Sequence, residues 1–171
     1  MENGLAGLYK QQGKYGEAEP LYLRALSGNE AELGETHPNT LGTVDSLATL
    51  YARQGKYGEA EPLFLRALSG REAELGETHP DTLGTVNNLA VLYKQQGKYG
   101  EAEPLYLRAL SGREAELGET HPSTLRTANN LALLYEKQGK YSKVKPLFIR
   151  VVSGREAELG EIHSSHTFLI K

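Results

Sequence analysis

The segment that decides the fold, residues 87–110, reads NNLAVLYKQQGKYGEAEPLYLRAL. Its first half places Leu89 and Tyr93 on one helical face, and its second half repeats that spacing with Ala102 and Tyr106. Gly97 lies between the halves, where a glycine can end a helix in the left-handed conformation. The segment therefore predicts two antiparallel helices joined by a short turn.

This pattern recurs along the whole chain. The tripeptide Gly-Lys-Tyr begins at positions 13, 55, 97 and 139, a spacing of 42 residues. A period of about 20–50 residues is typical of a solenoid, in which each unit packs only against its neighbours. We therefore expect an all-α array of stacked helix pairs whose function is binding.

Two residues complicate the second helix of each pair. Pro104 would kink a helix interior, but a helix beginning near Tyr99 places it in the first turn or just beyond, where few hydrogen bonds are lost. Gly112 costs about 1 kcal/mol relative to alanine in a helix interior. We predict that the helix nevertheless continues to Leu117 and ends at Gly118, because the segment between them is rich in glutamate.

The composition excludes several kinds of protein. The chain of 171 residues has 19 Lys and Arg against 22 Asp and Glu, a net charge of −3 that argues against a general nucleic-acid binder. It lacks cysteine, a run of about 18 apolar residues and the pattern of a secretory signal. We expect a cytoplasmic protein that needs no cofactor and has no nucleic-acid or membrane partner.

One histidine recurs in each unit, at His37, His79, His121 and His163. Units separated by a helix diameter of about 10 Å cannot bring these side chains to one metal ion, whose ligands lie at about 2 Å. We predict instead that each histidine lies in the turn before a first helix. The chain also lacks the phosphate-loop, nucleophile-elbow and dinucleotide motifs, so we expect no catalytic activity.

The pattern of Leu89, Ala90, Tyr93, Gly97 and Tyr99, followed by an alanine, an aromatic residue and Ala-Leu, resembles the tetratricopeptide repeat. The usual unit of that family has 34 residues, and the longer unit here looks like the repeats of kinesin light chains. The resemblance implies a right-handed α-α superhelical solenoid with a concave groove for peptides. It covers one array over residues 1–165, with units at about 1–40, 41–82, 83–124 and 125–165 and a C-terminal tail at 166–171.

The chain departs from light chains in two ways. Ser111-Gly112 replaces larger residues, and no heptad region precedes the array, so we expect no direct coiled-coil contact with a motor heavy chain. In the fourth unit, the expected loop at 162–165 lacks the proline found in earlier loops. The first unit begins inside its first helix with no capping helix, so we also expect a fragment of a longer array or self-association through the ends. A stable monomer in concentrated sedimentation runs would count against self-association.

The second and third units differ mainly along one stripe of the first helix. Five of their seven differences lie there, at offsets of 0, 1, 4, 7 and 8 residues from Asp45 or Asn87. In tetratricopeptide arrays, the resemblance implies, this stripe lines the concave groove. Free drift of exposed residues is the plain alternative, yet glutamates elsewhere on the surface are identical in both units. The predicted groove residues are Asp45, Ser46, Thr49, Arg53, Asn87, Asn88, Val91, Lys94, Gln95, Arg126, Asn129, Asn130, Leu133 and Lys137.

The chemistry of this stripe suggests its ligand. Asparagine carboxamides can pair with the backbone of an extended peptide, lysine and arginine add positive charge, and Val91 and Leu133 add apolar contact. We therefore expect a protein or peptide ligand with acidic side chains, in an adaptor role similar to cargo recognition by kinesin light chains. The partner could belong to a motor or a signalling complex. Two alternatives stay open: a regulatory segment of a larger nucleotide-binding signalling protein, and a structural spacer.

Overall fold

The computed structural model describes the backbone of residues 2–168 and the side chains of residues 3–156. All regular secondary structure in this part of the chain is helical, which confirms the all-α prediction. The first helices of the pairs are α1 (Glu2–Gln11), α3 (Pro38–Arg53), α5 (Pro80–Gln95) and α7 (Pro122–Lys137). The second helices are α2 (Tyr15–Leu33), α4 (Tyr57–Leu75), α6 (Tyr99–Leu117) and α8 (Tyr141–Phe168).

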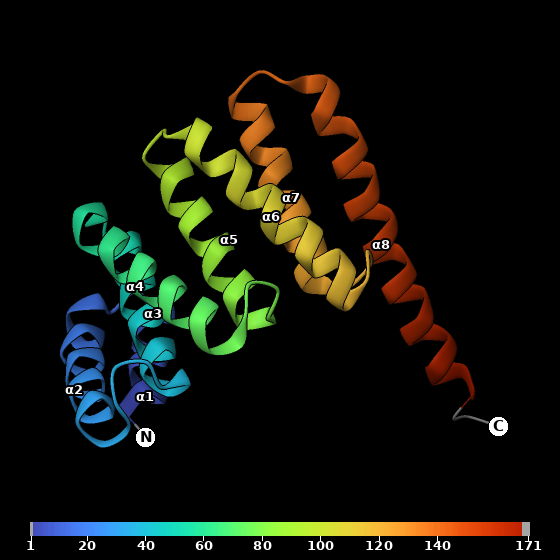
Figure 1. The fold of residues 1–171 in the computed structure, drawn as a ribbon. Coiled ribbons are helices and arrows are strands. Elements are labelled where there is room, and N and C mark those ends of the chain that lie inside the picture. Colours follow the sequence, from blue (N-terminus) through green and yellow to red (C-terminus); the bar gives the residue numbers. More distant parts are fainter. Residues whose placement is uncertain (1, 169–171) are drawn as a thin grey trace.

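The helix pairs follow one another along an arc (Figure 1). Each helix packs against the next one in the chain, and each first helix also contacts the first helix of the following pair. Among the described residues no two second helices make such a contact. The first helices are therefore crowded together on the inner side of the arc, and the second helices spread apart on the outer side.

Turns and caps fix where the helices begin and end. Gly97 has a φ of 75° two residues after the end of α5, and Gly118 has a φ of 89° directly after α6, so both adopt the conformation that glycine favours. The Nδ1 atom of His79 accepts a hydrogen bond from the backbone N–H of Asp81, and His37 and His121 make the same contact in their units. The predicted turn role of these three histidines is confirmed, whereas the backbone of His163 lies inside α8, so its predicted turn position is wrong.

The second helix runs without a break through its mid-helix glycine, as predicted. Gly112 lies so close to the preceding first helix that an added Cβ atom would be 2.7 Å from Cδ1 of Leu83. Leu83 is 1% exposed, so the glycine allows it to pack against the α6 backbone. Pro104 is the sixth residue of α6, just beyond the first turn.

The last helix differs from the earlier second helices. α8 extends to Phe168 and so includes residues 162–165, where the sequence predicted a loop. That prediction is wrong. The earlier loops lead into a first helix through a proline, such as Pro122, and residues 162–165 contain no proline to stop the helix.

Candidate functional site

The first helices α1, α3, α5 and α7 form the inner side of the arc, and we call this surface the inner groove. The structure brings the predicted residues together there, on three neighbouring helices that contact one another in sequence. Four of them are exposed: Arg53, Gln95, Arg126 and Lys137. Nine are partly buried: Asp45, Ser46, Thr49, Asn88, Val91, Lys94, Asn129, Asn130 and Leu133. Asn87 alone among these fourteen is fully buried, with 4% of its surface exposed.

Carboxamides connect the first helices of neighbouring units. The Nδ2 atom of Asn88 donates to Oδ2 of Asp45 over 3.1 Å, and the Nδ2 atom of Asn130 donates to Oδ1 of Asn87 over 3.4 Å. Asn87 therefore holds Asn130 in place instead of reaching the surface itself. Asn88 and Asn130 keep further donor and acceptor capacity for a ligand at the surface.

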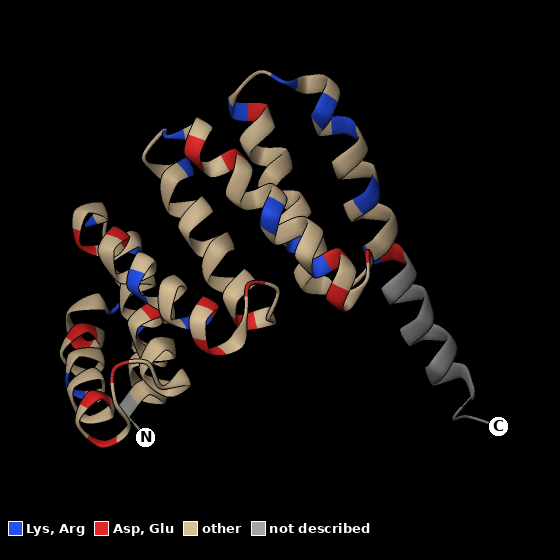
Figure 2. Cartoon of the chain, viewed as in Figure 1, with Lys and Arg blue, Asp and Glu red and all other residues tan. Residues whose placement is uncertain are grey.

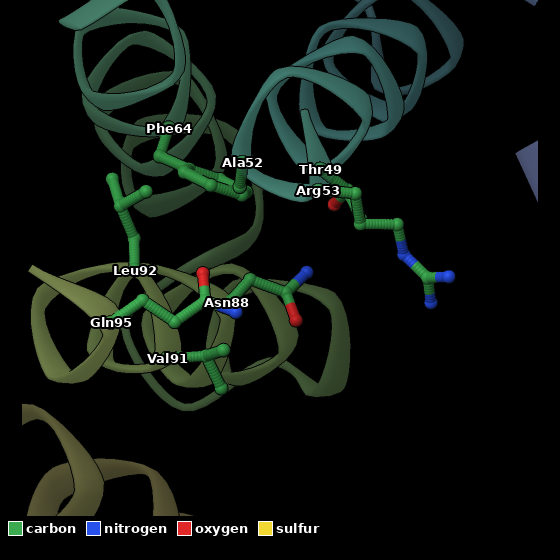
Figure 3. Close-up of a pocket in the computed structure, with 8 residues that line it drawn as sticks. All are labelled: Thr49, Ala52, Arg53, Phe64, Asn88, Val91, Leu92 and Gln95. Carbon is green, nitrogen blue, oxygen red and sulfur yellow. The ribbon is translucent and has the colours of Figure 1, made fainter. Parts of the chain in front are cut away.

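A pocket of about 320 Å³ opens into the inner groove between α3 and α5. Its floor is apolar, and Figure 3 shows the ring of Phe64 reaching toward Ala52 while the guanidinium of Arg53 points away from the other side chains. Polar side chains from both helices form its rim. The lining residues are Thr49, Ala52, Arg53, Phe64, Asn88, Val91, Leu92 and Gln95. Five of these eight were predicted as groove residues, and the pocket combines an apolar floor with polar groups that could orient a ligand.

Two of the residues that line this pocket are smaller than their counterparts in the neighbouring units. One unit later, Lys94 replaces Ala52 and Tyr106 replaces Phe64. In the first unit the same two positions are Lys10 and Tyr22, and the amino group of Lys10 lies 5.4 Å from the ring centre of Tyr22. The lysine and the tyrosine hydroxyl thus occupy space that the smaller pair leaves open between α3 and α5. We call this cavity the anchor pocket.

Positive charge follows the inner groove on both sides of the anchor pocket. Burial lowers the pKa of Lys10, and the nearby guanidinium of Arg53 lowers it further. Burial also lowers the pKa of Lys94, with a second contribution from Lys137. Figure 2 shows that most of the charged residues on the first half of α8 are basic as well, but α8 lies outside the inner groove, and Lys143 and Arg150 form ion pairs with Glu103 and Glu114. Like charges that disfavour each other in this way favour an acidic ligand between them.

Sequence reasoning missed a set of arginines behind the groove. The Nη1 atom of Arg71, on α4, donates to the backbone oxygen of Asp81 over 3.0 Å and to the hydroxyl of Thr85. It also lies 3.7 Å from Oδ1 of Asp45, which makes an ion pair. A signal was present in the sequence, because this arginine is identical in three of the four units and only Asn29 replaces it.

The described residues provide neither a metal site nor a helix that could span a membrane. They hold no cluster of His, Cys, Asp or Glu side chains with the arrangement of a metal site. Nor does any helix in that part of the chain have the length and apolar character that crossing a bilayer requires.

Comparison with known proteins agrees with this geometry. A family model described as the tetratricopeptide repeat matches residues 1–73, 41–115 and 82–157. Comparison with curated proteins gives no match.

Three solved structures illustrate the likeness. BtubC (BKLC) of P. vanneervenii superposes with a TM-score of 0.83 at 26% identity, over 93% of this chain and 63% of that one. The chain thus spans less than two thirds of that relative. A kinesin light chain-type protein of Podosopora anserina with nearly identical TPR-like repeats has a TM-score of 0.61 at 21% identity, over 92% and 94% of the two chains. MamA of MSR-1 has a TM-score of 0.60 at 20% identity, over 92% and 76%. At these lower identities the likeness concerns the fold.

Proposed function

Because the chain belongs to the tetratricopeptide repeat family, we propose that its inner groove binds an extended acidic peptide, with one apolar side chain seated in the anchor pocket. The repeats themselves indicate a scaffold for protein–protein interaction. The preference for an acidic peptide with one apolar side chain is inferred from the residues of the inner groove.

The anchor pocket is the observation that carries the proposal. It lies in the stripe where the repeats differ most, and its floor is made of side chains that are buried in the array, Phe64 and Leu92. A peptide that inserts an apolar side chain there removes apolar surface from water, at a gain of about 25 cal/mol per Å². The pocket thus supplies affinity, and its polar rim supplies orientation.

The rest of the groove suits an extended acidic chain. Asn88 and Asn130 lie on successive first helices, where their carboxamides can pair with a peptide backbone whatever its sequence. Arg53 lines the pocket, and Lys94 and Lys137 add positive charge to the neighbouring helices α5 and α7. Acidic side chains of the ligand would accelerate association and fix the register of binding.

A peptide array screened with the purified protein tests the proposal. The decisive variant combines Ala52→Lys with Phe64→Tyr, which gives the anchor pocket the residues found one unit later. Both side chains are native to this repeat position, so the fold is expected to tolerate them. The matched control is Leu65→Ala, which removes an exposed side chain from α4 outside the pocket.

We expect the wild-type protein and the Leu65→Ala variant to select the same acidic peptides with one dominant apolar residue. The double variant should lose that apolar preference and bind those peptides at least tenfold more weakly, a change of about 1.4 kcal/mol. Unchanged selection by the double variant would place recognition elsewhere. A wild-type protein that selects no peptide would favour the spacer alternative.

A further inference from the structure

The same three positions form a polar cluster at each junction between units, and the charged groups in this cluster differ from one junction to the next. It consists of a residue of one first helix, a residue of the following second helix, and a threonine of the next first helix. Between the first two units the cluster is neutral: Asn3 and Asn29 both donate to the hydroxyl of Thr43, over 2.7 and 3.0 Å. Between the second and third units it holds the ion pair of Arg71 and Asp45, and its net charge is zero.

At the third junction no carboxylate compensates the positive charge of the arginine. Arg113 donates to the backbone oxygen of Ser123 over 3.1 Å and to the hydroxyl of Thr127, just as Arg71 does one unit earlier. The position of Asp45 is now held by the neutral Asn87. Arg113 is 3% exposed, and among the described residues it forms no ion pair with a carboxylate. A buried guanidinium without a counter-charge is costly unless an anion approaches from outside.

The surroundings of Arg113 add to its positive charge. Arg126, exposed on α7, occupies a position that is glycine in the two preceding units, Gly42 and Gly84. Burial and the charge of Arg126 lower the pKa of Arg113 to about 10. The positive charges of Arg113 and Arg126 therefore favour an acidic group of the ligand over α5 and α7, next to Asn130.

We propose that an acidic side chain of the ligand lies over this third cluster, against the exposed Arg126 and the half-buried Asn130, with the buried Arg113 adding positive charge from behind. Asn87 sets this preference because it is not an aspartate. This inference rests on the proposed function and adds the spacing between the acidic and the apolar residue of the ligand. The anchor pocket lies between α3 and α5, and the charged cluster lies between α5 and α7. Packed helices are about 10 Å apart and an extended chain advances about 3.3 Å per residue, so the acidic residue lies about three positions from the apolar residue, on the α7 side.

Repeat-to-repeat exchanges test this arrangement. Asn87→Asp gives the third cluster the ion pair of the second, and Asp45→Asn gives the second cluster the uncompensated arginine of the third. Ser69→Asp adds the same negative charge on the exposed surface of α4 and controls for net charge. The probes are unlabelled peptides of twelve residues that contain one leucine and, three and four positions away from it, two glutamates. In the control peptides, glutamine replaces both glutamates. Binding to the isotope-labelled protein is followed by NMR titration at low salt.

We expect the wild-type protein and Ser69→Asp to prefer the glutamate peptide over the glutamine peptide on the order of tenfold. Asn87→Asp should remove that preference while binding to the glutamine peptide persists, and Asp45→Asn should increase it. If the wild-type protein prefers glutamate and Asn87→Asp keeps the preference, the inference is wrong and the proposed function stands. If the wild-type protein binds neither peptide, both fall together.

Discussion

Replacing Gly112 by alanine tests how the repeats pack, because two opposing effects meet at that position. Alanine is a better helix former than glycine by about 1 kcal/mol, and α6 is continuous there. The new Cβ atom would lie 2.7 Å from Cδ1 and 2.8 Å from Cδ2 of Leu83. Both methyl groups are too close, so a rotation of the leucine about its terminal bond cannot relieve the contact.

The chain supplies a matched control at the same repeat position. An added Cβ at Gly28 has nothing within 4 Å, so Gly28→Ala should show the helix effect alone and stabilise the protein by about 1 kcal/mol. Overpacking of a buried contact costs about 1–3 kcal/mol. Gly112→Ala should therefore destabilise the protein by up to about 2 kcal/mol, and the difference between the two variants isolates the steric cost.

Urea denaturation followed by far-ultraviolet circular dichroism measures both variants against the wild type. The reasoning requires that Gly28→Ala raises the free energy of unfolding and that Gly112→Ala lowers it. If both substitutions stabilise the protein to the same extent, Leu83 does not need the space beside Gly112, and the packing explanation of this glycine is refuted.

Three further predictions concern single side chains. Tyr106→Phe should stabilise the protein by about 1 kcal/mol in urea denaturation, because the buried hydroxyl has no hydrogen-bond partner among the described residues; a loss of stability would contradict this. His121→Ala should cost about 1 kcal/mol by removing the cap of α7, and His121→Asn should restore most of it in the same assay. The hydrogen bond from Lys140 lowers the pKa of Glu103 below its ordinary value of 4.5, so its stabilisation is present above that pH and lost as the pH falls through the lowered pKa. Thermal denaturation between neutral and acidic pH should show a shallower acid loss in Glu103→Gln than in the wild type, and equal slopes would exclude this role.

Much of the fold follows from local sequence. The period of 42 residues, the glycines after the first helices and the histidine–proline turns predict the helix pairs, because each feature acts within a few residues of the chain. The continuous second helix was also predicted from local propensity. The reason for Gly112 was not, since it depends on Leu83, which comes from another helix. The end of α8 was missed because a loop was expected by analogy with units that contain a proline.

The site was predicted less completely. A helical stripe identified the residues around the anchor pocket, since Thr49, Arg53 and Val91 line it as periodicity suggests. It could not show that Asn87 is buried, because its hydrogen-bond partner, Asn130, belongs to the next unit. The buried Arg113 was missed for the same reason: its partners lie in the following first helix. Contacts between units require the superhelix, which a single helical projection does not contain.

Photo-crosslinking tests the central claim most directly. A peptide selected by the array would carry benzoylphenylalanine in place of its apolar residue, and mass spectrometry would identify the crosslinked position on the protein. The account predicts crosslinks to α3 and α5 around the anchor pocket, within residues 49–53 and 88–95. Crosslinks confined to the exposed side of the second helices, for example at Leu65 or Leu107, would contradict it.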